Sequence, residues 1–148
     1  MKRFMLSIAL ASVLLAGCSS FSNSELSGAR NRWQAAHISH YRYKLNVGCF
    51  CAFTQHMPLT IEVENGRVVN MSFEDGSALS PQDQQNFAQY QTVDALFDFT
   101  AQSIRKADEV KTEYDPAYGF PARVQIDFIK QAVDDELALS VSDFQPLP

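Results

Sequence analysis

The feature that constrains this fold most is a run of alternating apolar and polar residues interrupted by one Asn-Gly pair. Every second side chain is apolar over residues 40–49, and the alternation returns over residues 59–63 and 69–73. A period of two places one set of side chains on one face of a strand, so each run predicts a half-buried strand. Asn65-Gly66 favours a two-residue hairpin, because both turn positions need positive φ. The region therefore predicts three antiparallel strands that share one buried face.

Apolar residues at three- and four-residue steps predict two amphipathic helices. The first covers residues 25–39, and the second begins after Thr92, a good N-cap, and ends near Lys106. The expected apolar stripes are Leu26, Ala29, Trp33 and Ala36 in the first helix, and Val93, Leu96, Phe97, Ala101 and Ile104 in the second. A short helical turn is expected after Pro81.

Three further strands are expected at residues 110–114, 122–128 and 136–144. Charges of mixed sign on the outward positions of these strands are typical of a sheet with one solvated face. The sequence thus predicts an α+β fold, a mainly antiparallel sheet of about six strands with two helices on one face. Because a helix followed by three strands occurs twice, the order suggests a duplicated unit, and cystatin-like folds have a similar arrangement.

The N-terminus has the composition of an export signal. Lys2 and Arg3 precede an apolar run of twelve residues, 4–15, broken only by serines. A membrane-spanning helix needs about 20 apolar residues, so this run fits the core of a signal peptide instead. The sequence predicts a signal peptide over residues 1–17.

The signal ends in Leu15-Ala16-Gly17-Cys18, which resembles the lipobox of bacterial lipoproteins. The resemblance implies cleavage before Cys18, acylation of its sulfur with chains such as palmitate, and attachment to a lipid membrane. Ser19 follows where Asp would favour the inner membrane, so the resemblance implies the outer membrane, with the domain facing the periplasm. We expect residues 18–24 to be the lipidated cysteine and a polar tether, and residues 25–148 to form one domain.

Charge limits the partners of the processed chain. Removing the signal leaves ten basic and seventeen acidic side chains, a formal charge of −7. Nucleic acid does not suit such a surface, so the expected partners are the membrane and an envelope protein or small ligand. Most of the acidic excess lies after residue 73, where fourteen acidic residues face five basic ones.

Cys49 and Cys51 remain after Cys18 is assigned to lipid, and an oxidising periplasm permits a disulfide. In a regular strand these residues would lie about 6.6 Å apart, too far for a bond, so a bridge requires the strand to break at Phe50. Two buried thiols are the other structural interpretation. A metal clip or thiol-linked role would recruit His56, and His37 or His40 with it, but structural zinc prefers four ligands. The disulfide and the free thiols both remain open.

Two other motifs have a functional and a structural interpretation. The sequence YDPAYGFP, residues 114–121, would expose Tyr118 and Phe120 at a loop tip, or pack them back on the sheet, which we favour. Asp134-Asp135-Glu136 lacks the spacing of a calcium-binding loop and fits a polar turn. No hydrolase, metalloprotease or paired-acid motif is present, so we expect no catalytic residue, metal or cofactor.

Several motifs occur in an order that resembles an uncharacterised family of bacterial lipoproteins with a domain of unknown function. They are Trp33 with Tyr41-x-Tyr43, Cys49-x-Cys51, Val63-x-Asn65-Gly66, Thr92-Val93-x-x-Leu96-Phe97, Tyr-Asp-Pro-x-x-Gly-Phe-Pro over residues 114–121, Ile126-Asp127 and Asp134-Asp135-Glu136. The resemblance implies an anchored, secreted α+β domain and transfers no activity. We therefore expect a non-catalytic binding or protein-interaction module. The alternative is a thiol- or metal-linked envelope factor that uses Cys49, Cys51 and His56.

Overall fold

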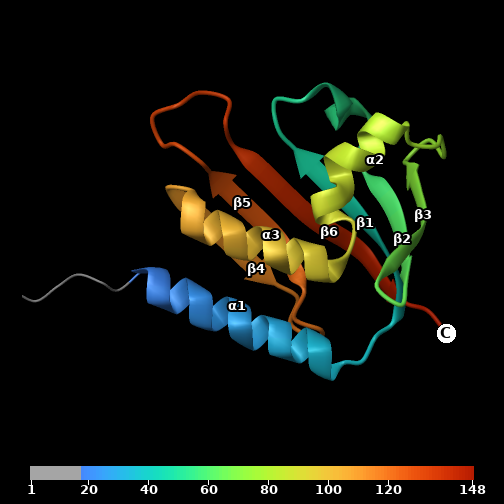
Figure 1. Ribbon diagram of the computed structural model, residues 1–148, viewed down its shortest axis with the longest axis horizontal. Coiled ribbons are helices and arrows are strands. Elements are labelled where there is room, and N and C mark those ends of the chain that lie inside the picture. The colour runs from blue at the N-terminus through green and yellow to red at the C-terminus, as the bar shows by residue number, and fades with distance from the viewer. Residues whose placement is uncertain (1–17) are drawn as a thin grey trace, which may run out of the picture.

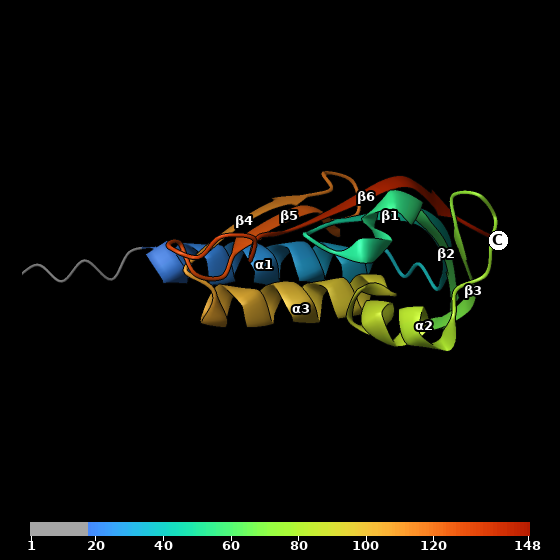
Figure 2. The ribbon, with the colours of Figure 1, turned by 90° about the horizontal axis from the view of Figure 1, so that it is seen from above.

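The computed structural model describes residues 18–148, with side chains from residue 23 onward. Three α-helices cover one face of a six-stranded antiparallel sheet (Figure 1 and Figure 2), so the predicted α+β class is confirmed. The elements are α1 (Cys18–Ala35), β1 (His40–Gly48), η1 (Ala52–His56), β2 (Leu59–Glu64), β3 (Arg67–Phe73), α2 (Pro81–Phe87), η2 (Ala88–Tyr90), α3 (Val93–Lys106), β4 (Glu109–Tyr114), β5 (Pro121–Asp127) and β6 (Leu137–Pro146). The predicted signal peptide lies outside the described residues. Over residues 18–148, no helix has both the length and the apolar character needed to cross a membrane.

The strand order is β3-β2-β1-β6-β5-β4, which places the first and last strands side by side at the centre (Figure 1). A helix followed by three strands does occur twice, as the sequence suggested. The two halves, however, join through β1, the first strand of the first half, and β6, the last strand of the second half. The central strand β1 therefore corresponds to the edge strand β4, and the edge strand β3 corresponds to the central strand β6.

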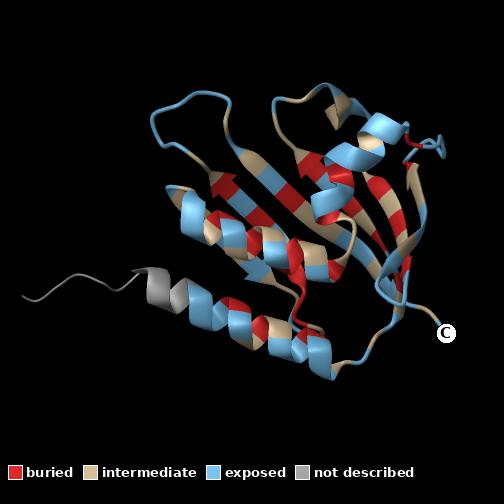
Figure 3. Cartoon of the chain, in the orientation of Figure 1, coloured by how far each residue is buried: buried red, intermediate tan, exposed pale blue. Residues whose placement is uncertain are grey.

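The predicted hairpin joins β2 and β3. Asn65 and Gly66 have φ angles of 50° and 75°, and Glu64 pairs with Arg67 across the turn. The alternating apolar side chains of β1 and β2 are buried under the helices (Figure 3). They are Tyr41, Tyr43, Leu45, Val47, Leu59, Ile61 and Val63.

Two tyrosine hydroxyls tie β1 to the helical layer. The Tyr41 hydroxyl accepts a hydrogen bond from the Val93 N–H at 3.1 Å, at the first residue of α3. Tyr43 donates to the Tyr90 carbonyl at 3.0 Å. Burial raises the pKa of Tyr41 to about 12, so its hydroxyl stays neutral.

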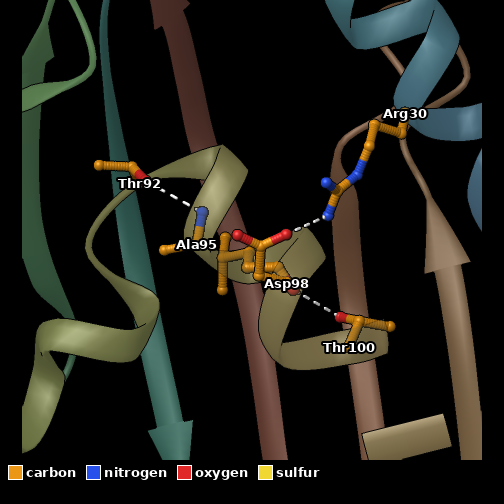
Figure 4. Close-up of polar contacts among 6 residues, drawn as sticks. Arg30, Thr92, Ala95, Asp98 and Thr100 are labelled. Atoms are coloured by element: carbon orange, nitrogen blue, oxygen red, sulfur yellow. Dashed lines mark hydrogen bonds and ion pairs between the residues drawn. The ribbon is translucent and has the colours of Figure 1, made fainter. Parts of the chain in front are cut away.

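Helix α3 begins and ends where the sequence predicted. The Thr92 side chain accepts a hydrogen bond from the Ala95 N–H at 3.0 Å, while the Thr100 hydroxyl donates to the Leu96 carbonyl inside the helix (Figure 4). An ion pair of 2.6 Å between Arg30 and Asp98 joins α1 to α3 (Figure 4). The same guanidinium lies 5.1 Å from the centre of the buried Phe97 ring.

Helix α1 starts earlier than expected. Residues 18–24, predicted as a tether, form its first turns, and the helix ends at Ala35. Its buried face includes Leu26, Ala29 and Trp33, as predicted. A helix rises only about 1.5 Å per residue, so these seven residues span roughly 10 Å, where an extended tether would reach roughly 20 Å.

Candidate functional site

Strand β1 stops at Gly48, and the next three residues form a bonded turn. The Sγ atoms of Cys49 and Cys51 are 2.11 Å apart, and their Cα atoms are 5.2 Å apart. The Cys51 N–H donates to the Cys49 carbonyl at 2.8 Å, which closes a three-residue turn. The turn presents Phe50 to solvent with 86 % of its surface exposed. The strand therefore breaks at the position that a bridge between Cys49 and Cys51 requires. We call residues 49–51 the disulfide turn.

The segment after β5 lies beside this turn, because Gly48 pairs with Ala138 at the start of β6. We call residues 128–136 the acidic loop, since it ends in Asp134-Asp135-Glu136. These three residues form a loop, as expected, and Asp134 has a positive φ of 69°. Val133 is 83 % exposed on the same loop. The disulfide turn and the acidic loop together form one end of the molecule.

Two hollows meet at this end. One, the sheet-face hollow of about 630 Å³, lies on the solvent face of the sheet. Its floor is a row of paired residues on four neighbouring strands: Gly48, Ala138, Gln125 and Lys111. The other, the interlayer hollow of about 800 Å³, opens between the ends of the central strands and the α2 and α3 helices. The residues that line both hollows are Cys49, Phe50, Asp134, Glu136 and Leu137.

Carboxylates without partners concentrate at this end. Within the described residues, Oδ1 of Asp127 and both carboxylate oxygens of Asp135 are screened from solvent and have no hydrogen-bond partner. Burial raises the pKa of Asp127, and the nearby charges of Asp135 and Glu136 raise it further. By contrast, hydrogen bonds from Lys111 and Lys130 lower the pKa of Glu109. The acidic loop therefore holds negative charge that its neighbours do not neutralise.

The substitution Asp127→Asn is expected to raise stability slightly at neutral pH. A carboxyl whose pKa is raised on folding destabilises the folded state once it ionises. The gain is therefore complete above the raised pKa and disappears as the pH falls below the ordinary value, where the carboxyl is protonated in both states. Thermal melts of both proteins at several pH values test this. A gain that persisted unchanged in acid would contradict the assigned cause.

The sequence also suggested histidine ligands, which the structure places apart. The His56 ring packs on Phe73 at 5.3 Å and lines neither hollow. His40 contacts Glu62 at 3.0 Å, far along β1 from the disulfide turn. The described residues contain no group of three His, Cys, Asp or Glu side chains placed to hold a metal. Because the disulfide also uses both sulfurs, Cys49, Cys51 and His56 do not form a common site.

The YDPAYGFP loop packs back on the sheet, as favoured from the sequence. Phe120 is buried, and the rings of Tyr118 and Phe120 lie 5.4 and 4.6 Å from that of Phe144. Asp115 accepts hydrogen bonds from the Ala117 and Tyr118 N–H groups through its Oδ1. Gly119 of this loop lies against the α1 backbone at Ala29, and the loop lines neither hollow.

Sequence reasoning missed most of the residues that line the interlayer hollow. They come from separate segments and include Phe53, Tyr90, Phe99, Ser103 and Phe128. Ser103 gave one usable signal, because it stands seven residues after Leu96 and so lies in the apolar stripe of α3. A polar residue in such a stripe often borders a cavity or a polar contact.

The fold and the hollows define the class: a small antiparallel α+β domain with a ligand-sized recess beside a bonded turn. By comparison with protein families, the chain belongs to the Family of unknown function (DUF6174), which matches residues 25–146. The match covers all six strands and all of the helices except the first seven residues of α1. Neither curated proteins nor solved structures gave a match.

Proposed function

We propose that this protein is a lipoprotein anchored to the outer membrane through acylated Cys18, with a periplasmic domain that is a non-catalytic binding module. The observation that carries the binding role is the meeting of two hollows, about 630 and 800 Å³, at one end of the sheet. Ligand sites usually have volumes of about 300–1,000 Å³. The exposed Phe50 stands between the two hollows and gives a partner an apolar contact.

The anchor rests on the sequence before the domain. The apolar run over residues 4–15 and the Leu15-Ala16-Gly17-Cys18 pattern support export and acylation. Two or more acyl chains on one cysteine give durable attachment. Because α1 begins at Cys18, the domain follows the anchor without an extended spacer and would act close to the membrane surface.

A binding role fits the chemistry of the hollows better than a catalytic one. Among the described residues, the ionisable side chains that line them are carboxylates, the two lysines Lys106 and Lys111, and Tyr90. Neither hollow contains a histidine or a free thiol that would act as a base or nucleophile for acyl transfer. The lining is instead suited to holding a partner by shape and charge.

Replacing Cys18 with alanine is expected to abolish acylation and release the chain from the membrane. Cells that express either protein are labelled with a palmitate analogue and then fractionated. The wild-type chain should carry the label and sediment with outer membranes, and the Cys18→Ala chain should do neither. A Ser19→Ala variant is the matched control and should keep both properties. Label on the Cys18→Ala chain would contradict the proposed anchor.

A further inference from the structure

The interlayer hollow has an aromatic wall. Phe53, Tyr90, Phe99 and Phe128 line it from four different segments. Tyr90 and Phe99 meet edge to face with their centroids 4.9 Å apart, and Phe53 meets Phe87 in the same way at 4.8 Å. Aromatic faces and apolar stems suit a ligand with an apolar body, and the faces also attract cations.

One rim of the same hollow is acidic. Asp134, Asp135 and Glu136 line it, against a single basic residue, Lys106. Both carboxylate oxygens of Asp135 are screened from solvent and have no hydrogen-bond partner among the described residues. Carboxylate oxygens without a donor are costly to screen from water, and Asp134 and Glu136 add exposed negative charge beside them, so this rim is suited to a cationic group supplied from outside.

A polar group also lies inside the hollow. Ser103 is only 3 % exposed and lines it, and no hydrogen bond within the described residues involves its hydroxyl. The hollow is also lined by the exposed amides of Gln85, from α2, and Gln102, from α3. A ligand with more than one polar N–H group would find acceptors in these amides as well as in the carboxylates.

We propose that the interlayer hollow binds an organic cation, a primary ammonium carried on an aliphatic stem. The stem would lie against Phe53 and Phe99, and the ammonium would face the acidic rim formed by Asp134, Asp135 and Glu136. This proposal rests on the binding role proposed above and names the chemistry of its ligand. A bare divalent metal ion fits less well, because the described residues place no three metal ligands together and the wall is aromatic.

The test is a calorimetric titration of the full chain in detergent micelles with matched probes. N-acetyl-lysine methylamide carries the ammonium, and N-acetyl-norleucine methylamide has a similar stem without it. We expect the norleucine probe to bind about tenfold more weakly, from the lost ion pair and cation–π contact. Pentylammonium forms a second arm. Tighter binding than the lysine probe would indicate a free amine as the ligand, and weaker binding would indicate a lysine side chain of a peptide.

Two variants locate the binding. Asp135→Asn should weaken binding of the lysine probe about three- to tenfold and leave the norleucine probe unchanged. Glu113→Gln removes an equal charge that lines neither hollow and pairs with Arg123, so it should have no effect. Changes in the amide NMR shifts of Phe99 and Ser103 on titration would show that the probe binds in the interlayer hollow. The same spectra show whether each variant is folded.

Several results would overturn the proposal. They are equal binding of the lysine and norleucine probes, binding that Asp135→Asn does not weaken, binding of calcium alone, and no binding of any amine. Equal binding of both probes would leave the binding module intact and reject only the cation. Failure of membrane anchoring in the Cys18 experiment would not affect these titrations, so the two proposals fail separately.

Discussion

Replacing Gly119 with alanine is expected to lower the free energy of unfolding by about 2–5 kcal/mol. Gly119 has a φ of +84°, where a side chain alone costs about 1–2 kcal/mol. A Cβ atom there would also overlap the Ala29 carbonyl and lie 2.9 Å from the Cβ of Arg32. Both atoms are fixed to the backbone of α1, so neither can rotate away, and overpacking of this kind costs about 1–3 kcal/mol. The strain would push α1 away from the sheet.

Gly66→Ala is the matched control. Gly66 has a similar φ of +75°, but nothing lies within 4 Å of its added Cβ. It should lose no more than the conformational cost of about 1–2 kcal/mol. Urea denaturation followed by fluorescence of Trp33, the single tryptophan, measures both variants. Equal losses in the two variants would show that the contact between Gly119 and α1 is unimportant.

The elements predicted best from the sequence are those determined by local chemistry. Asn65-Gly66 specified its hairpin because few other residues tolerate two positive φ angles in succession. Thr92 and the spacing of Val93 and Leu96 gave α3 its bounds, since a cap and a stripe are both readable within one or two turns. Such signals depend on neighbours in the chain and need no knowledge of the packing.

Elements that depend on distant contacts were predicted less well. The start of α1 was missed because residues 18–24 are mainly polar and carry no stripe. In α3, Thr100 and Ser103 are more buried than the expected Ala101 and Ile104. The helix is rotated slightly, because it packs on α1 as well as on the sheet. The pairing of β1 with β6 joins the ends of the chain, which no local pattern encodes.

The candidate site was predicted only in part. The pair Cys49 and Cys51 was visible in the sequence, and the geometry of a strand showed that a bridge requires a break. The interlayer hollow was not visible, because its lining comes from segments as far apart in the sequence as residues 47–53 and 134–137. Asp135 illustrates the limit: the sequence shows an acidic turn, but only the fold shows that its oxygens lack partners.

Replacing Phe97 with alanine is expected to cause the largest loss of stability in the core, about 3–5 kcal/mol. The ring is completely buried between the helices and the sheet. It stacks on Tyr114 with centroids 6.4 Å apart and supports the Arg30 guanidinium at 5.1 Å. Truncation would leave a cavity that these fixed neighbours cannot fill. Whole domains are stable by only about 5–15 kcal/mol, so the variant should be close to unfolding at room temperature.

Two controls separate burial from the chemistry of phenylalanine. Phe50→Ala makes the same change at a ring that is 86 % exposed, and it should alter stability by no more than about 0.5 kcal/mol. Phe97→Leu keeps most of the volume and should lose about 1.5 kcal/mol or less. Urea midpoints and the steepness of each transition give the three values. If Phe97→Ala lost no more stability than Phe50→Ala, the result would contradict the packing of α1 and α3 around the Phe97 ring. A loss of stability that increases from Phe50→Ala through Phe97→Leu to Phe97→Ala would show that the helices contact the core mainly through the Phe97 ring.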